Sequence, residues 1–142
     1  MTARVRAADV AVGAELPEQT HRVTRADLVR YAGASGDLNP IHWSDRVATG
    51  VGLPGVIAHG MLTMGLTARA VTDWAGDPAA LVEYQVRFGR PVVVSDDDAG
   101  AEVTVRGRVA QVLDGGRVRV DLTVTSGGEK VLSLARAVVA LA

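Results

Sequence analysis

The chain has 142 residues, of which 48% are hydrophobic and 22% are charged, a composition typical of one globular domain that can bury a core. Its formal net charge is −1 and its basic residues are spread along the chain, which argues against the clustered basic face of a nucleic-acid-binding protein. The absence of cysteine excludes disulfides, thiol nucleophiles and thiolate metal sites, and no apolar run approaches the roughly 20 residues of a membrane span. No apolar signal segment opens the chain, so we expect a cytoplasmic protein that forms a single domain over residues 1–142.

The first regular element that the sequence predicts is a short helix over about residues 25–33. Thr24 is followed three positions later by Asp27, which fits a capping box with Asp in the acidic position. Apolar residues follow at helical spacing, and Gly33 and Gly36 are expected to end the helix. Residues 4–23 are mixed in character and indicate a turn-rich entry to the domain.

Residues 34–57 are rich in Gly, Pro, Asp and Asn and show little periodicity. Only residues 44–49 are compatible with one helical turn. A loop of this length is unusual inside a compact domain, and such loops often carry function. We therefore expect the residues that carry chemistry in this segment.

Asp37 and His42 stand five positions apart in this loop, around Pro40. A carboxylate and an imidazole can share one water and move its protons in opposite directions, as is needed to add water to an activated carbon–carbon double bond or to remove it. The competing interpretation is a simple turn, in which Asp and Asn bond their own backbone and Pro fixes φ. On the residues alone, both interpretations stay open.

Residues 59–74 give the strongest helix prediction in the chain. Apolar residues recur every four positions, and only two side chains are charged. A helix this apolar should be largely buried, so the rest of the chain must wrap around it. The recurring positions are Leu62, Leu66, Ala70 and Trp74.

The beginning of this helix is a second candidate for function. A helix N-terminus presents free backbone N–H groups and partial positive charge, and Gly60 lets a ligand approach the backbone closely. A thioester carbonyl that turns into an enolate needs such donors. For His59 we considered a contact with the substrate or its protons, and a structural hydrogen bond from its ring to a neighbouring loop, and we favour the second.

The remaining sequence predicts an antiparallel sheet. Apolar and polar residues alternate over 82–88, 103–110 and 118–124, and residues 131–141 form a nearly all-apolar last strand. Glycine-rich turns at 114–116 and 127–128 indicate tight hairpins. The expected fold class is α+β, a curved antiparallel sheet wrapped around one long helix, whose exposed edge favours pairing with a second copy.

Two segments of the chain resemble a known family. Residues 31–42 read YAGASGDLNPIH and are similar to the signature of the MaoC-like, or hydratase 2, family, and residues 57–62, IAHGML, resemble its second block. Residues 39–45 and 63–65 are most similar to the branch that contains the catalytic B subunit of the mycobacterial 3-hydroxyacyl-carrier-protein dehydratase. The resemblance implies a hotdog fold and an R-specific hydro-lyase, an enoyl-thioester hydratase or 3-hydroxyacyl-thioester dehydratase of fatty acid metabolism.

The resemblance also implies roles for individual residues. Asp37 and His42 match the catalytic pair, and Asn39 matches the residue that helps to hold the pair and its water. Gly60 matches the position whose backbone N–H receives the thioester carbonyl, and Ser35 matches a motif position that shapes the turn. The implied partners are an acyl-CoA or acyl-carrier-protein thioester as substrate and a second hotdog subunit, identical or related, in a dimer.

Two other functions remain open. A hotdog thioesterase would use a carboxylate on or near the central helix, where the sequence offers only Asp73. A non-catalytic or partner-dependent acyl-binding subunit would share the fold. No metal or cofactor is expected, because the three histidines come without cysteine or an evident His/Asp cluster, and no G-x-G-x-x-G follows a predicted strand. Arg87 and Arg90 are candidates to meet a phosphate of the acyl carrier.

Overall fold

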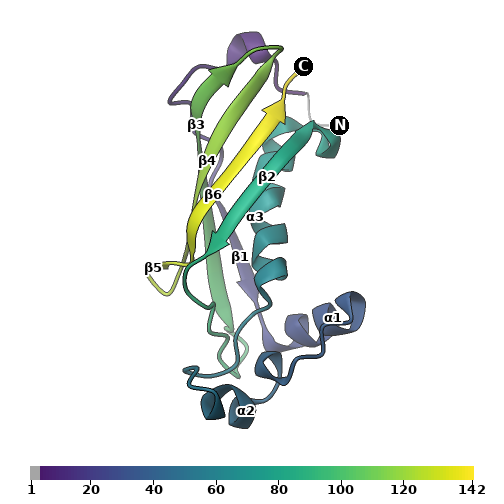
Figure 1. The fold of residues 1–142 in the computed structure, drawn as a ribbon, viewed down its shortest axis with the longest axis vertical. Coiled ribbons are helices and arrows are strands. Elements are labelled where there is room, and N and C mark those ends of the chain that lie inside the picture. Colours follow the sequence, from purple (N-terminus) through teal and green to yellow (C-terminus); the bar gives the residue numbers. More distant parts are fainter. Residues whose placement is uncertain (1–3) are drawn as a thin grey trace.

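The computed structural model describes residues 4–142. One antiparallel sheet curves along one side of the long helix α3 (Gly60–Ala75), and the helices α1 (Arg25–Ser35) and α2 (Asp45–Gly50) lie beyond the end of the sheet at which α3 begins (Figure 1). Three short 3₁₀ turns complete the helical part, at Ala7–Asp9, Pro40–His42 and Pro78–Ala80. The predicted arrangement of a curved sheet around one helix is confirmed.

The six strands pair in the order β1-β3-β4-β6-β2, with β5 paired to β4 outside this path. The hairpin β3–β4 turns at the predicted pair of glycines, Gly115 and Gly116, which both have positive φ. Strand β2 pairs with β6 at one edge of the sheet and not with the next strand along the chain. The strand bounds are β1 Gln19–Val23, β2 Leu81–Phe88, β3 Ala101–Leu113, β4 Arg117–Ser126, β5 Glu129–Lys130 and β6 Leu132–Ala140.

Strand β1 was missed in the sequence analysis, which described residues 4–23 only as turn-rich. The strand is five residues long and pairs antiparallel with β3 at the other edge of the sheet. Its sequence, QTHRV, holds a single strongly apolar residue, Val23, which is also its only buried one. This segment is therefore a strand because it pairs with β3, which lies about 80 residues further along the chain. The local sequence pattern does not predict a contact between such distant segments.

Helix α3 is within one residue of its predicted bounds, but its burial differs from the prediction. Its buried face packs against the sheet, and the opposite face, which includes Met61 at 60% exposure, is not covered by any part of residues 4–142. The half-buried Leu62 and Leu66 flank the buried stripe. Among residues 4–142, no helix is both long and apolar enough to cross a membrane. The fully buried positions of α3 are Thr63, Thr67, Ala70, Val71 and Ala75.

Helix α1 begins at the predicted capping box. The Thr24 side chain accepts a hydrogen bond from the Asp27 backbone N–H, and the Asp27 carboxylate accepts one from the Thr24 backbone N–H. The helix runs through Gly33 and ends at Gly36, whose φ of 76° is in the left-handed region that glycine adopts at little cost. Gly36 thereby turns the chain into the loop that carries Asp37.

Candidate active site

A chain of short-range hydrogen bonds shapes the loop after α1. The Asp37 backbone N–H donates to Ser35 Oγ at 3.2 Å, and Asp37 Oδ1 accepts from the Asn39 backbone N–H at 3.2 Å. Asn39 Oδ1 in turn accepts from the Ile41 backbone N–H and caps the 3₁₀ turn that Pro40 opens. The side chains of Ser35 and Asn39 therefore hold the backbone of this loop and fix where its carboxylate stands.

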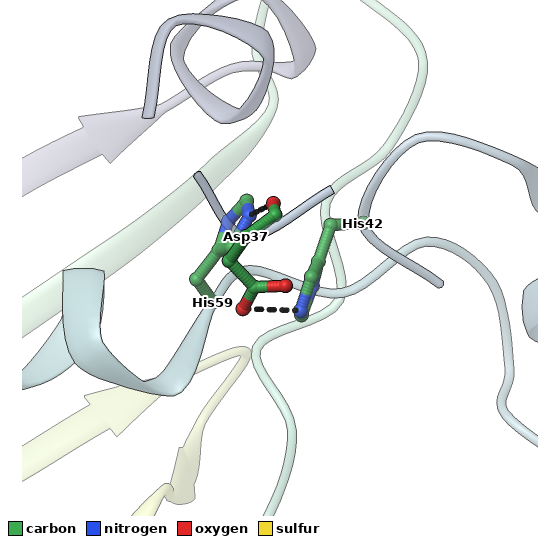
Figure 2. A group of neighbouring side chains, drawn as sticks. All are labelled: Asp37, His42 and His59. Atoms are coloured by element: carbon green, nitrogen blue, oxygen red, sulfur yellow. Dashed lines mark hydrogen bonds and ion pairs between the residues drawn. The ribbon is translucent and has the colours of Figure 1, made fainter. Parts of the chain in front are cut away.

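The ring of His42 is buried and held in one orientation. Its Nδ1 lies 2.7 Å from the carbonyl oxygen of Ile57. A carbonyl only accepts, so Nδ1 carries the proton and Nε2 keeps its lone pair. Figure 2 shows that this free Nε2 points at the carboxylate of Asp37, with Oδ2 at 3.8 Å.

The gap between Asp37 and His42 suits a shared water better than a direct bond. A distance of 3.8 Å exceeds hydrogen-bonding range, but it is shorter than two hydrogen bonds of about 2.8 Å placed end to end. One water oxygen can therefore touch both Asp37 Oδ2 and His42 Nε2. Asp37 is 51% exposed and His42 is 8% exposed, so the pair has one side in solvent and one side in the protein.

A cavity of about 260 Å³ lies beside His42. Its wall is formed by the start of α3, the end of β2 and the segment that follows β2. Gly60 and Thr63 come from the helix, and Phe88 and Arg90 come from the strand side. A second and larger cavity, of about 560 Å³, lies between α1, β1 and α3, where Tyr31 and Leu62 are part of its lining.

Helix α3 begins at this cavity without a side-chain cap. His59 occupies the N-cap position but makes no capping hydrogen bond. The backbone N–H groups of Gly60 and Met61, which precede the first hydrogen bonds of the helix, therefore remain beside the cavity that Gly60 lines. A Cβ atom at position 60 would meet the ring of Phe88 at 3.0 Å, so the glycine leaves room here for the neighbouring ring as well as for a ligand.

His59 lies behind the pair and contacts both of its members. Its Nε2 donates to the backbone carbonyl of Asp37 at 3.2 Å, and its ring stacks on His42 with the centroids 3.8 Å apart and the planes 23° apart (Figure 2). The ring of Tyr31 also approaches His59, with the centroids 4.8 Å apart and the planes tilted by 57°. Burial is the main cause that lowers the pKa of His59, and the positive charge that His42 can carry lowers it further, against an opposing contribution from Asp37.

The expectation that the chain holds no His/Asp cluster is wrong. Asp37, His42 and His59 each bring one potential metal-ligand atom into a group that spans 4.8 Å. The lone pair of a ring nitrogen lies in the ring plane, and these two rings stack with their planes 23° apart, so their free lone pairs lie in separate, nearly parallel planes and do not converge on one point. As arranged, the cluster fits proton transfer better than the convergent ligand geometry that a metal ion requires.

The structure brings Asp37, His42 and His59 together and places Gly60 on the wall of the same cavity. Ser35 and Asn39 lie in the loop, with their side-chain oxygens engaged by backbone N–H groups. Two contributors to this region were not singled out from the sequence, namely the ring of Phe88 and the carbonyl of Ile57. An aromatic residue that ends a strand, and a backbone carbonyl, carry no sequence signal of such a role.

A curved antiparallel sheet along one long helix is the hotdog architecture. A family model described as a MaoC like domain matches residues 9–127. The chain therefore belongs to the MaoC-like domain family, and the resemblance of residues 31–42 and 57–62 to that family is confirmed.

Three comparisons show what this chain is similar to. The 3-hydroxyacyl-thioester dehydratase X of Mycobacterium tuberculosis is 39% identical over 98 residues, which cover 63% of this chain and 34% of that protein. A solved MaoC-like dehydratase is 43% identical with a TM-score of 0.93, over 96% of this chain and 42% of that one. The chain thus spans between a third and a half of these two proteins. The ChsH1–ChsH2 complex from Mycobacterium tuberculosis is 28% identical with a TM-score of 0.78, over 93% of this chain and 98% of the matched one.

Proposed function

We propose that this chain is a hydro-lyase that reversibly hydrates trans-2-enoyl thioesters to R-3-hydroxyacyl thioesters. The observation that carries the proposal is the facing pair of Asp37 Oδ2 and His42 Nε2, 3.8 Å apart, next to the cavity at the open start of α3. Membership of the MaoC-like family and the similarity to a protein named as a 3-hydroxyacyl-thioester dehydratase support the same reaction class.

In hydration, one water lies between the two side chains. His42 Nε2 accepts a proton from this water while the hydroxyl adds to Cβ of the substrate. Asp37 orients the water, receives that proton from His42 across the gap and delivers it to Cα, which leaves both groups in their starting forms. The pair takes up one proton and gives one back, so the reaction balances, and the roles reverse in dehydration.

The thioester carbonyl gains negative charge while water adds. In this proposal the carbonyl accepts hydrogen bonds at the start of α3, chiefly from the Gly60 backbone N–H, where no side chain competes for the amides. Donors that are already in place for a developing oxyanion are often the largest single contribution to catalysis. Proton transfer by placed side chains adds a factor of roughly 10²–10⁴ in rate.

The proposal is tested by following the absorbance of crotonyl and longer enoyl thioesters in the wild type and in the Asp37→Asn and His42→Ala variants. We expect each variant to lower kcat/KM by roughly 10²–10⁴ while it keeps the circular dichroism of the wild type. Matched controls are Asp98→Asn, at an exposed loop residue, and His21→Ala, both with near wild-type rates. An unchanged rate in either active-site variant contradicts the mechanism.

A thioesterase is less compatible with the structure. Asp73 is the only acidic residue of α3, and it lies in the last turn, where it accepts a hydrogen bond from Gln19. Thioesterase activity would release free thiol from an acyl thioester, and the hydratase proposed here would not. A thiol reagent added to the same assay therefore separates the two reactions.

The proposed partner is a second hotdog domain, either a copy of this chain or a relative. Strand β2 has an unpaired edge within residues 4–142, and Val82 and Phe88 on it are about half exposed. The outer face of α3 is uncovered in the same region. The similarity to a chain of the ChsH1–ChsH2 complex is compatible with pairing between two such chains. The carrier, coenzyme A or an acyl carrier protein, would approach past Arg90 at the rim of the cavity.

A further inference from the structure

We infer that His59 is a positioning residue of the Asp37–His42 pair, which holds the Asp37 loop through its Nε2–H and supports the ring of His42 through its face. This inference rests on the proposed function, because it assigns His59 a part in the same reaction. His59 touches neither the shared water nor the thioester in this assignment. It acts through the two residues that do.

The first support is a hydrogen bond that ties the loop to the central helix. Nε2 of His59 lies 3.2 Å from the carbonyl oxygen of Asp37, which only accepts, so the proton of His59 sits on Nε2. The carbonyl oxygen of His59 accepts from the backbone N–H groups of Leu62 and Thr63, at 3.1 and 3.2 Å, so its own main chain is fixed to α3. The backbone of Asp37 is thereby held at a set distance from the start of α3.

The second support is a stack of rings. The ring of His59 stacks on His42, with the centroids 3.8 Å apart, and the tilted ring of Tyr31 approaches it at 4.8 Å. The hydrogen bond from His42 Nδ1 to the Ile57 carbonyl fixes the edge of its ring, and the stack fixes its face. With an edge and a face both held, Nε2 of His42 keeps its direction toward Asp37.

The third support is the charge of His59. Tyr31, Asp37 and His42 are the titratable groups that contact it. Burial and the adjacent His42 keep the His59 ring neutral near neutral pH. A neutral neighbour lets His42 take a proton from water without the repulsion of a second cation at 3.8 Å.

The presence of an imidazole at this position needs a reason, because it has a cost. Nδ1 of His59 is buried and has no hydrogen-bond partner among residues 4–142. An apolar ring of similar size would avoid this unsatisfied nitrogen. Phenylalanine, however, lacks the donor to the Asp37 carbonyl, and glutamine lacks the ring that stacks on His42. Histidine supplies both contacts.

The test compares His59→Phe, which keeps a ring, with His59→Gln, which keeps a donor, by kcat, KM and the pH profile of kcat/KM. We expect kcat to fall about ten- to a hundredfold in both variants, with KM changed less than about threefold, because misplaced groups chiefly affect the chemical step. His59→Gln should also move the acid limb of the profile, because it removes the stacked ring. The matched controls His21→Phe and His21→Gln should match the wild type.

A histidine ¹⁵N spectrum of the free wild type tests the geometry without any variant, and we expect the Nε2–H tautomer for His59 and the Nδ1–H tautomer for His42. If the wild type is active and both His59 variants keep its kcat and pH profile, the role of His59 is overturned and the proposed function stands. The opposite tautomer of His59 has the same consequence. A wild type without hydratase activity on any enoyl thioester contradicts the proposed function, and this inference falls with it.

Discussion

The two longest helices, α1 and α3, begin in opposite ways. At α1, Thr24 and Asp27 close the helix end with reciprocal hydrogen bonds. At α3, His59 holds the N-cap position but turns its ring away from the helix, to the carbonyl of Asp37. One end is satisfied by side chains, and the other is left open beside a cavity.

The closed start of α1 and the open start of α3 should contribute differently to stability and to function. A capping interaction is worth about 1 kcal/mol of stability, and α3, which packs against the sheet, would gain as much from one as α1 does. Its absence at α3 keeps backbone donors available to a ligand, and glycine as the first helical residue leaves space in front of them. The open end should therefore matter for activity, and the closed end for stability.

Among the variants that test the difference between the two helix ends, Gly60→Ala is expected to have the largest effect. The added methyl group would meet the Phe88 ring at 3.0 Å and would narrow the approach to the first-turn amides. We expect kcat/KM to fall about ten- to a hundredfold, because oxyanion donors that are out of reach lose most of their value. Phe88 is half exposed and can move, so the melting temperature should change little.

The double variant Gly60→Ala with Phe88→Ala separates the two consequences of that methyl group. If displacement of the ring caused the loss, removal of the ring would bring the kcat/KM of the double variant back to the level of Phe88→Ala alone. We expect no such recovery, because the methyl group itself crowds the carbonyl site. Full recovery would remove the argument for an oxyanion site at Gly60.

A smaller effect is expected at the closed end. Thr24→Ala removes the hydroxyl that accepts from the Asp27 backbone N–H, and its expected cost is about 1 kcal/mol of unfolding free energy. Activity at saturating substrate should stay within about twofold of the wild type, since the site lies beyond the other end of α1. Urea unfolding and the hydration assay on the same sample measure both quantities. A variant that loses activity but not stability would reverse the roles assigned to the two helix ends.

The smallest effect is a dependence on pH. Hydrogen bonds from the backbone N–H and the hydroxyl of Thr24 lower the pKa of Asp27. The folded-state pKa is then below the unfolded value of roughly 3.9, so this stabilisation is complete above the unfolded pKa and is lost as pH falls through the folded one. The stability difference between wild type and Asp27→Asn should therefore be constant from pH 6 to 8, and it should shrink below about pH 4. A difference that grows in acid would contradict this assignment.

Much of the fold could be predicted from the sequence because local signals are strong. Three such signals each correspond to a feature of the structure: the capping box at Thr24, the helical periodicity of residues 59–74 and the glycine turn at residues 115–116. Strand β1 and the place of β2 beside β6 could not be predicted, since both depend on pairing between distant segments. The sequence also did not predict that one face of α3 is left uncovered. The pattern of apolar residues in a helix is the same whether its own chain or a partner covers that face.

The candidate site was only partly visible in the sequence. The spacing of Asp37 and His42 and their resemblance to a family motif pointed to the pair, but not to the distance between them. The ring of His59 was assigned to a neighbouring loop without identifying Asp37 as the acceptor. The stack of His42 on His59 joins residues 17 positions apart, and it forms only when the start of α3 meets the loop.

The central claim is that Asp37 and His42 handle one water from one side of the substrate. Its most direct test is hydration of an enoyl thioester in D₂O, with the relative configuration at Cα and Cβ of the product determined by NMR. Because both groups lie on the same face, we expect the hydroxyl and the deuterium to add to the same face of the double bond. Addition to opposite faces would require a second proton donor across the substrate, and it would contradict the account.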